Sequence, residues 1–192
     1  MKPGVGLGRW LLFWSIALGG AWFDLASKAA VFGWIGPPPA PVVAIIPGIL
    51  ELRTSLNTGA LWGLGRTLPH SSLIFAGLSI VAAIAICYWL FVRGAAASLP
   101  LTIALGLIMA GALGNCYDRL VYGSVRDFVH FHVDSIGFDC AIFNFADNML
   151  VAGALTLVFF ALRPELPEGS SEYQGGAAQE LVSPPAEPAR PS

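Results

Sequence analysis

Four long apolar segments constrain the fold of this chain more than any other feature of its sequence. They cover approximately residues 10–32, 71–92, 98–118 and 143–162, and each is close to the roughly 20 residues that a helix needs to cross about 30 Å of hydrocarbon. We therefore predict a membrane all-α protein, a bundle of four transmembrane helices. The first segment contains Asp24 and Lys28, and no small-residue cleavage site follows it, so we expect it to be retained rather than removed as a signal peptide.

The composition supports lipid as the main solvent of this chain. Hydrophobic residues make up 56% of the 192 and charged residues 11%, and the mean hydropathy is +0.70, which is unlike an ordinary water-soluble domain. The three cysteines form neither an even set nor a CxxC pair, so no disulfide or zinc framework is predicted. Because the sequence has no basic stripe to replace phosphate counterions, we expect no nucleic-acid partner.

Charge divides the chain into a body and a tail. Residues 1–163 hold nine Lys and Arg against seven Asp and Glu, whereas residues 164–192 hold one against five. The tail is rich in Pro, Gly and Ser and has almost no large apolar residues, so burial cannot offset its ordering entropy. We expect residues 1–163 to form one transmembrane domain and residues 164–192 a disordered, acidic, Pro-rich tail in the cytoplasm.

The orientation of the bundle is predicted from the Lys and Arg residues that flank the apolar segments. Four of these basic residues fall on each side of the membrane. The short N-terminus and the short connection around Arg93 favour a cytoplasmic location, because positive charge acts mainly in short flanks. Both termini are then cytoplasmic, and the connections 33–70 and 119–142 are extracytoplasmic. The first connection mixes β-branched residues with Pro and Gly breaks, which predicts a small sheet at the membrane surface.

Ionisable residues at bilayer depth need a partner or a function, because each costs about 2.5–3.5 kcal/mol on insertion scales. Asp24 and Lys28 are four residues apart, so they share a helix face and are expected to form an ion pair. Asp118 precedes Arg119, which suggests a salt bridge at the end of the helix. Such a bridge would keep that carboxylate ionised and make it a poor proton donor or acceptor near neutral pH.

Two further aspartates fall at the same end of the predicted bundle. Asp127 follows the third segment after a short excursion that contains a glycine, and Asp147 opens the fourth. Asp147 alone also fits a helix N-terminal acid stabilised by the macrodipole. Two carboxylates within hydrogen-bond reach share a proton, however, and such a pair can activate water as a base while it protonates a substrate oxygen as an acid. Asp127 and Asp147 are therefore candidates for amide hydrolysis without a metal.

Four motifs carry a resemblance to a known family: DLASK at 24–28, NTGALWG at 57–63, GNCYDRLVYGSVRDF at 114–128 and FNFAD at 143–147. In this order and at these positions they resemble the lipoprotein signal peptidases, also called signal peptidase II, which are bacterial aspartic endopeptidases of the inner membrane. The resemblance covers roughly residues 10–163. It implies removal of signal peptides from diacylglyceryl-modified prolipoproteins, with cleavage just before the lipidated cysteine at the extracytoplasmic face, and it implies no cofactor. We expect a monomer in contact with membrane lipid.

The same resemblance assigns roles to individual residues. It implies that Asp127 and Asp147 are the catalytic pair. The residues expected to bind substrate or support the site are Asp24, Lys28, Asn57, Asn115, Asp118, Arg119 and Asn144. The sheet predicted within residues 40–66 resembles the family's extracytoplasmic cradle, and the connection 119–142 resembles its helix-containing loop over the active site. The stretch HFHVDSIGFDC at 130–140 departs from the family's motifs.

Two other functions fit parts of the sequence. His130, His132 and Asp134 alternate, so in a strand they share one face and could bind a metal, as in a metal-dependent membrane hydrolase; the sequence lacks the HExxH motif of one such class. Intramembrane carboxylates are also common in small proton or cation transporters. Against a transporter, the acids cluster near one surface, and the segments show no clear inverted repeat.

Overall fold

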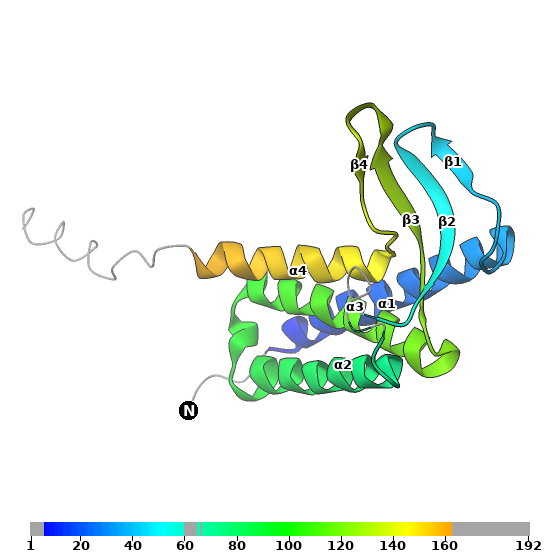
Figure 1. The fold of residues 1–192 in the computed structure, drawn as a ribbon. Helices are drawn as coiled ribbons and strands as arrows, with labels where there is room; N and C mark the ends of the chain where they lie inside the picture. The colour runs from blue at the N-terminus through cyan, green and yellow to red at the C-terminus, as the bar shows by residue number, and fades with distance from the viewer. Residues whose placement is uncertain (1–5, 60–64, 66, 163–192) are drawn as a thin grey trace, which may run out of the picture. The chain divides into compact units, whose positions relative to one another are not determined.

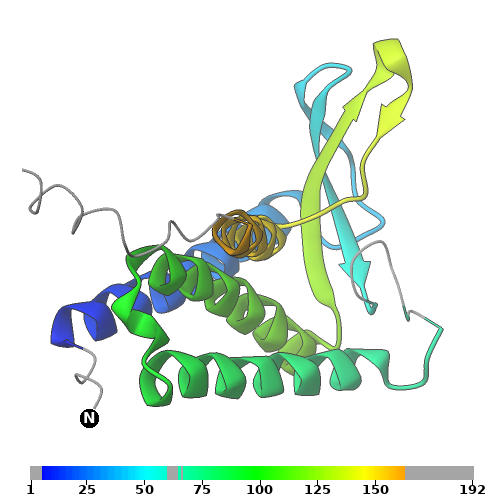
Figure 2. The ribbon, with the colours of Figure 1, turned by 90° about the vertical axis from the view of Figure 1, so that its left-hand side faces the viewer.

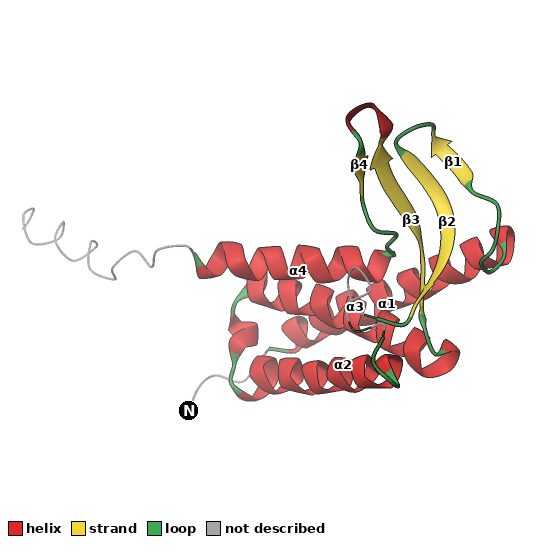
Figure 3. Ribbon diagram, viewed as in Figure 1, coloured by secondary structure: helices red, strands yellow, loops and turns green. Residues whose placement is uncertain are grey.

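The computed structural model of the protein describes residues 6–59, 65 and 67–162, which form a helical bundle and one small sheet (Figures 1 and 3). The helices are α1 (Leu7–Ile35), α2 (Ser71–Cys87), α3 (Leu99–Tyr122) and α4 (Phe145–Ala161). A π-helical turn, η2 (Tyr88–Val92), extends α2, and a 3₁₀ turn, η3 (Ala95–Ala97), leads into α3. The strands are β1 (Val43–Ile46), β2 (Leu50–Asn57), β3 (Val125–Val133) and β4 (Phe138–Asp139), with a 3₁₀ turn, η4 (Asp134–Ile136), between the last two.

Three of the four predicted spans become helices that are long and apolar enough to cross a membrane. They are α1, α2 together with η2 over Ser71–Val92, and α3. The fourth, α4, is apolar but has only 17 residues. It begins at Phe145 rather than at residue 143 because Phe143 pairs with Val129 of β3, which leaves Asn144 as the residue that caps the helix.

Helix α3 lies at the centre of the bundle and packs against each of the other three helices. In the most apolar stretch of α3, 61% of the residues are buried, compared with 22% in that of α1 and 17% in that of α2. Large apolar side chains such as Trp22, Leu78 and Leu155 are exposed on the outer helices, as expected where lipid rather than water surrounds a bundle. Small residues of α3, Gly106, Gly111 and Gly114, let neighbouring helices approach closely, because a Cβ atom at each would lie within 3.2 Å of an atom of another helix.

The sheet lies beside the C-terminal ends of α1 and α3 and the N-terminal end of α4 (Figures 1 and 2). Its strands are antiparallel in the order β1-β2-β3-β4. An extra residue in β2 shifts the register between Leu52 and Ser55, so that Ser55 lies opposite Asp127 and Asn57 opposite Val125. This bulge carries the end of β2 alongside the part of β3 that meets the helices.

The connection 119–142 differs from the predicted helix-containing loop. Helix α3 continues to Tyr122, and Gly123, with φ 70°, ends it in the left-handed conformation that favours glycine. The chain then enters β3 within two residues, and only the short turn η4 is helical before β4. The predicted sheet is therefore larger than residues 40–66 imply, and β3, with alternating side chains, carries Asp127.

The packing of α3 against α4 gives a testable prediction. A Cβ atom at Gly111 would meet the carbonyl oxygen of Ala146, whereas one at Gly77 in α2 would meet nothing within 4 Å. Replacing Gly111 with alanine should therefore destabilise the protein by about 1–3 kcal/mol through overpacking. Unfolding in detergent micelles measures this effect, and Gly77→Ala is the matched control. Equal stability of the two variants would contradict close α3–α4 packing.

Candidate active site

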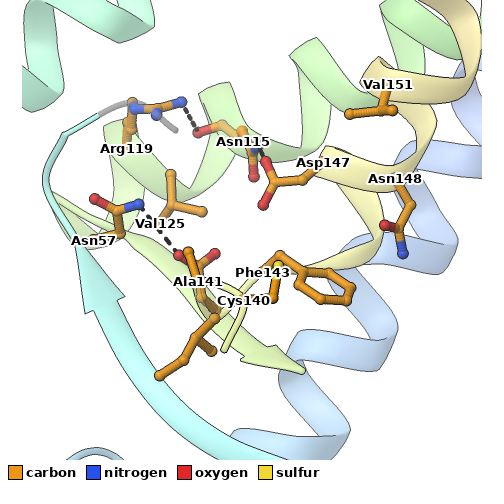
Figure 4. Close-up of a pocket in the computed structure, with 12 residues that line it drawn as sticks. Asn57, Asn115, Arg119, Val125, Cys140, Ala141, Phe143, Asp147, Asn148 and Val151 are labelled. Carbon is orange, nitrogen blue, oxygen red and sulfur yellow. Dashed lines mark hydrogen bonds between the residues drawn. The ribbon is translucent and has the colours of Figure 1, made fainter. Parts of the chain in front are cut away.

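Asp127 and Asp147 line one cavity, of about 290 Å³, where β3 meets α3 and the first turn of α4. The two aspartates come from two different kinds of element, a strand and a helix. Figure 4 shows Arg119 and Asn115 of α3, Asp147 of α4 and Asn57 of β2 gathered around the cavity. The rest of the wall is mainly apolar, and its lining side chains include Val125, Ile142, Phe143 and Val151.

Asp127 is buried, with 3% of its surface exposed, and two asparagines hold its carboxylate. The Asn144 amide donates to Asp127 Oδ1 at 2.6 Å, and the Asn57 amide donates to Asp127 Oδ2 at 3.3 Å, the latter drawn in Figure 4. No lysine or arginine within the described ranges forms an ion pair with Asp127. Its carboxyl group is therefore positioned by neutral donors and not by a cation.

Asp147 is half-buried and belongs to a reciprocal cap at the start of α4. Its backbone N–H donates to Asn144 Oδ1 at 3.0 Å, and its Oδ2 accepts the Asn144 N–H at 3.2 Å. This is a capping-box pattern, in which two backbone donors at a helix start are satisfied by two side chains. The other oxygen, Oδ1, accepts a hydrogen bond from the Asn115 amide at 2.9 Å. Asp147 is thus a helix N-terminal acid and also a wall of the cavity.

Asn144 connects the two aspartates. It is fully buried, and its amide nitrogen donates both to Asp127 Oδ1 and, at 3.2 Å, to Asn115 Oδ1, while its amide oxygen caps Asp147. One side chain therefore sets the position of Asp127 in the strand relative to Asp147 in the helix. An amide is suited to this task because it donates and accepts in fixed directions.

Lys28 supports the site through its hydrogen bond to Asn115. Its ammonium group lies 2.7 Å from Asp24 Oδ2, 3.3 Å from Asp118 Oδ2 and 2.9 Å from Asn115 Oδ1. The expected Asp24–Lys28 ion pair is therefore present, and both side chains are completely buried. Asp24 Oδ1 also accepts the Ala146 N–H of α4 at 2.8 Å, so this pair ties α1 to the helix that carries Asp147.

The predicted Asp118–Arg119 salt bridge is wrong. Asp118 is paired instead with Arg126, at 2.7 Å, and with Lys28. Consecutive residues of a helix point about 100° apart, so Asp118 faces the bundle while Arg119 turns toward the cavity. Arg119 donates to the Gly59 carbonyl at 3.0 Å, and its Nε has no hydrogen-bond partner among the described residues.

Burial raises the pKa of Asp127 to about 7, and the negative charge of Asp147 adds to the effect. The hydrogen bonds from Asn144 and Asn57 act in the opposite direction, since they favour the ionised carboxylate. Asp127 is therefore protonated at a pH where an ordinary aspartate is ionised. A protonated carboxyl beside a second carboxyl in one cavity can donate a proton while its neighbour accepts one.

Comparison with known proteins identifies the family. The family model described as signal peptidase (SPase) II matches residues 16–163. The chain belongs to the signal peptidase II family. Lipoprotein signal peptidases from Methylocella silvestris and Rhodopirellula baltica are 43% and 40% identical to this chain. The matches cover 81% and 78% of this chain and 90% and 71% of theirs.

Solved structures agree with this membership. A bacterial membrane enzyme determined by the in meso method at 2.3 Å resolution is 30% identical, with a TM-score of 0.70, and the match covers 84% of this chain and 92% of that one. A second, at 1.9 Å, has the same identity and TM-score and covers 86% of this chain and 99% of the other. The arrangement of apolar helices with a small antiparallel sheet is therefore shared with a bacterial membrane enzyme.

The His130–His132–Asp134 metal pattern does not lie at the cavity of Asp127 and Asp147. In the part of the chain that the structure describes, the group of side chains suited to hold a metal is Glu51, His130 and His132. Strand alternation places His130 and His132 on the face of β3 opposite Asp127. Asp134 is not in this group; its carboxylate hydrogen-bonds to Nδ1 of His132 at 2.9 Å.

Two contacts of the candidate site were not predicted from the sequence. Arg126 is the partner of Asp118, through Nη2 at 2.7 Å and Nε at 3.1 Å. Asn144 contacts both carboxyl groups, because its amide donates to Asp127 Oδ1 and its backbone N–H donates to Asp147 Oδ2. The alternating sequence VRDFVHFHV at 125–133 predicts a strand in which Arg126 and Asp127 point to opposite faces. It does not identify Asp118 as the partner of Arg126.

Proposed function

We propose that this chain removes signal peptides from diacylglyceryl-modified prolipoproteins, and that Asp127 and Asp147 are its catalytic pair. The observation that carries the proposal is the single cavity that holds both carboxyl groups, joined through Asn144. The names of the curated relatives support the substrate class. As a member of this family the chain is a membrane protease.

The two carboxyl groups divide the chemistry between them. Asp127 holds the proton near neutral pH, so it acts as the acid and Asp147 as the base. Asp147 takes a proton from water, the hydroxide oxygen bonds to the scissile carbonyl carbon, and Asp127 gives its proton to the carbonyl oxygen. In the second step a hydroxyl group of the tetrahedral intermediate returns its proton to Asp127 as the carbonyl re-forms, the C–N bond breaks, and the proton on Asp147 passes to the leaving nitrogen.

Arg119 is positioned to bind the peptide. It is 8% exposed, it lines the cavity, and its Nε donor is unpartnered among the described residues. A carbonyl oxygen of an extended peptide would satisfy that donor, since a buried unpaired donor is costly. We assign Asn57, Asn115 and Asn144 to holding the two carboxyl groups, and Asp24, Lys28 and Asp118 to supporting Asn115 and the start of α4.

A second cavity supports a lipidated substrate. It has a volume of about 480 Å³, lies among α2, α3 and α4, and shares Asn115, Arg119 and Asp147 with the first cavity. Its other lining residues are mainly apolar and include Phe75, Leu78 and Leu150. Acyl chains of the substrate would lie along this groove between the helices while the peptide reaches the two aspartates, so that lipid anchors the bond to be cut.

We further propose the topology and the domain limits. All four helices cross the bacterial inner membrane, both termini are cytoplasmic, and the sheet and the two aspartates lie at the extracytoplasmic end. Residues 1–163 form the peptidase domain, which works as a monomer in lipid without nucleic acid. The disordered tail proposed for residues 164–192 lies outside the described residues.

The experiment that tests this function is cleavage of a lipidated prolipoprotein by the purified protein, measured across the neutral pH range. We expect the rate to fall about tenfold per pH unit above about pH 7, because Asp127 then loses the proton that it must donate. Asn57→Ala removes a donor that favours the ionised form, so it should move this decline to higher pH. A rate that keeps rising above pH 7, or a shift of the decline to lower pH in Asn57→Ala, would contradict the assignment of Asp127 as the acid.

A further inference from the structure

A cluster of histidines and carboxylates lies on the sheet, away from the cavity of Asp127 and Asp147. Glu51 of β2 lies opposite His130 of β3, and its Oε1 is 2.7 Å from His130 Nδ1. Its Oε2 is 3.8 Å from His132 Nε2. The two imidazole rings are parallel, with centroids 5.0 Å apart and an interplanar angle of 8°. One nitrogen of each ring is therefore directed toward the same carboxylate.

These three ligand groups are close enough to share one ion. One ligand atom from each lies within 4.8 Å of the other two. Three such atoms lie no more than about 2.8 Å from a common centre, and Zn²⁺ binds nitrogen and oxygen at about 2.0–2.2 Å. A contraction of less than about 1 Å per ligand would close the site. Two histidines and one glutamate form a donor set that zinc accepts readily, with a fourth position left for water.

The remaining nitrogen of each histidine is already held by a carboxylate. His130 Nε2 lies 2.6 Å from Asp139 Oδ1, and His132 Nδ1 lies 2.9 Å from Asp134 Oδ1. Histidines that bind metals usually give their second N–H to such a carboxylate, which sets the tautomer and the direction of the ring. Here that partner is present for both histidines, supplied by β4 and by η4.

The charge of the cluster also favours a cation. Glu51, Asp134 and Asp139 bring three carboxylates to two imidazoles, and in the described ranges no lysine or arginine forms an ion pair with any of them. Glu51 and the two histidines have side chains that are 10–18% exposed. A bound divalent ion would offset the charge of Glu51, which water screens only partly, whereas the side chains of Asp139 and Asp134 are 74% and 73% exposed and water screens their charges.

We propose that Glu51, His130 and His132 bind one Zn²⁺ ion, with Asp139 and Asp134 orienting the two histidines. The ion would join β2 to β3, and through Asp139 to β4. Because Asp127 lies three residues before His130 on the same strand and faces the other way, the ion does not reach the peptidase cavity. It would act as a clamp on the sheet, and this role is independent of the proposed peptidase chemistry.

Zinc titration of the purified full-length protein tests the proposal. Metal is first removed with a chelator, and the chelator is then removed. Calorimetry with Zn²⁺ alone should give one site per chain, and Zn²⁺ should raise the unfolding temperature. His132→Gln should abolish this site, and Asp139→Asn should weaken it by about 10–100-fold. His70→Asn is the matched control, because His70 is exposed, lies outside the cluster and already has the left-handed backbone that asparagine tolerates.

The two classes of outcome are distinct. Binding of one Zn²⁺ that is lost in folded His132→Gln and retained in His70→Asn supports the clamp. Absence of one-to-one binding in the wild type, or equal binding by His132→Gln and the wild type, would overturn it and leave the cluster as a hydrogen-bonded network of histidines and carboxylates. Unfolding of each variant without metal verifies that the comparison is between folded proteins.

Discussion

Replacing Asp127 with asparagine is expected to lower the rate of prolipoprotein cleavage by about 10²–10⁴-fold, the range typical of general acid–base catalysis. Asparagine has nearly the same size, and its side-chain oxygen can still accept the hydrogen bond that Asn144 donates at 2.6 Å. It cannot transfer a proton. The measurement is the single-turnover rate of cleavage of a lipidated prolipoprotein by the variant in detergent or lipid, at the pH where the wild type is fastest.

The same variant should be at least as stable as the wild type. A stability measurement therefore distinguishes a loss of catalysis from a loss of folding. The pKa of Asp127 is raised from 3.8 to about 7 in the folded protein, so folding favours the protonated carboxyl. Its ionisation therefore reduces stability as pH rises from about 4 to about 7, and the full reduction persists above that. The Asp127→Asn substitution removes this effect, because an amide does not ionise. A variant that is both inactive and markedly less stable at pH 8 would contradict the assignment.

Replacing Lys28 with methionine should destabilise the protein by about 3–5 kcal/mol, the cost of removing one partner from a buried ion pair. Lys28 is completely buried, and its ammonium group contacts Asp24, Asp118 and Asn115. Asp118 keeps Arg126 as a partner, but Asp24 would be left as a buried charge without a cation. The free energy of unfolding in detergent micelles measures the change.

A second substitution provides the control for Lys28. Asp24→Asn removes the orphaned charge but keeps an oxygen for the Ala146 N–H, which Asp24 Oδ1 accepts at 2.8 Å. The double variant should therefore regain part of the stability that Lys28→Met loses. If the free energy of unfolding of Lys28→Met lay within about 1 kcal/mol of the wild-type value, this would contradict the role of Lys28 as the anchor of the site. A double variant less stable than Lys28→Met would contradict the charge argument.

Local spacing was sufficient to predict some contacts of this site. The Asp24–Lys28 pair follows from a four-residue separation on one helix, and the structure confirms it at 2.7 Å. The apolar segments likewise predicted α1, α2 with η2, and α3 to within a few residues. These features depend on helical periodicity and on apolar length, which are local properties of the chain.

Contacts across turns could not be predicted from local spacing. Asp118 pairs with Arg126 because α3 ends at Gly123 and the chain turns into β3, and the adjacent charges of Asp118 and Arg119 in the sequence did not indicate this pair. Asn57 reaches Asp127 only because an extra residue in β2 shifts the register between Leu52 and Ser55. Strand pairing and bulges are set by the packing of distant segments, so the local pattern of residues does not specify them.

The most direct test of the catalytic pair compares wild type, Asp127→Asn and Asp147→Asn on one lipidated prolipoprotein, with the unlipidated form as the parallel substrate and product masses as the readout. We predict that the wild type cuts the lipidated form just before its modified cysteine and cuts the unlipidated form far more slowly. Both folded variants should cleave the lipidated form at least about 100-fold more slowly than the wild type. Cleavage by either variant at a rate within about tenfold of the wild type would contradict a catalytic pair formed by Asp127 and Asp147.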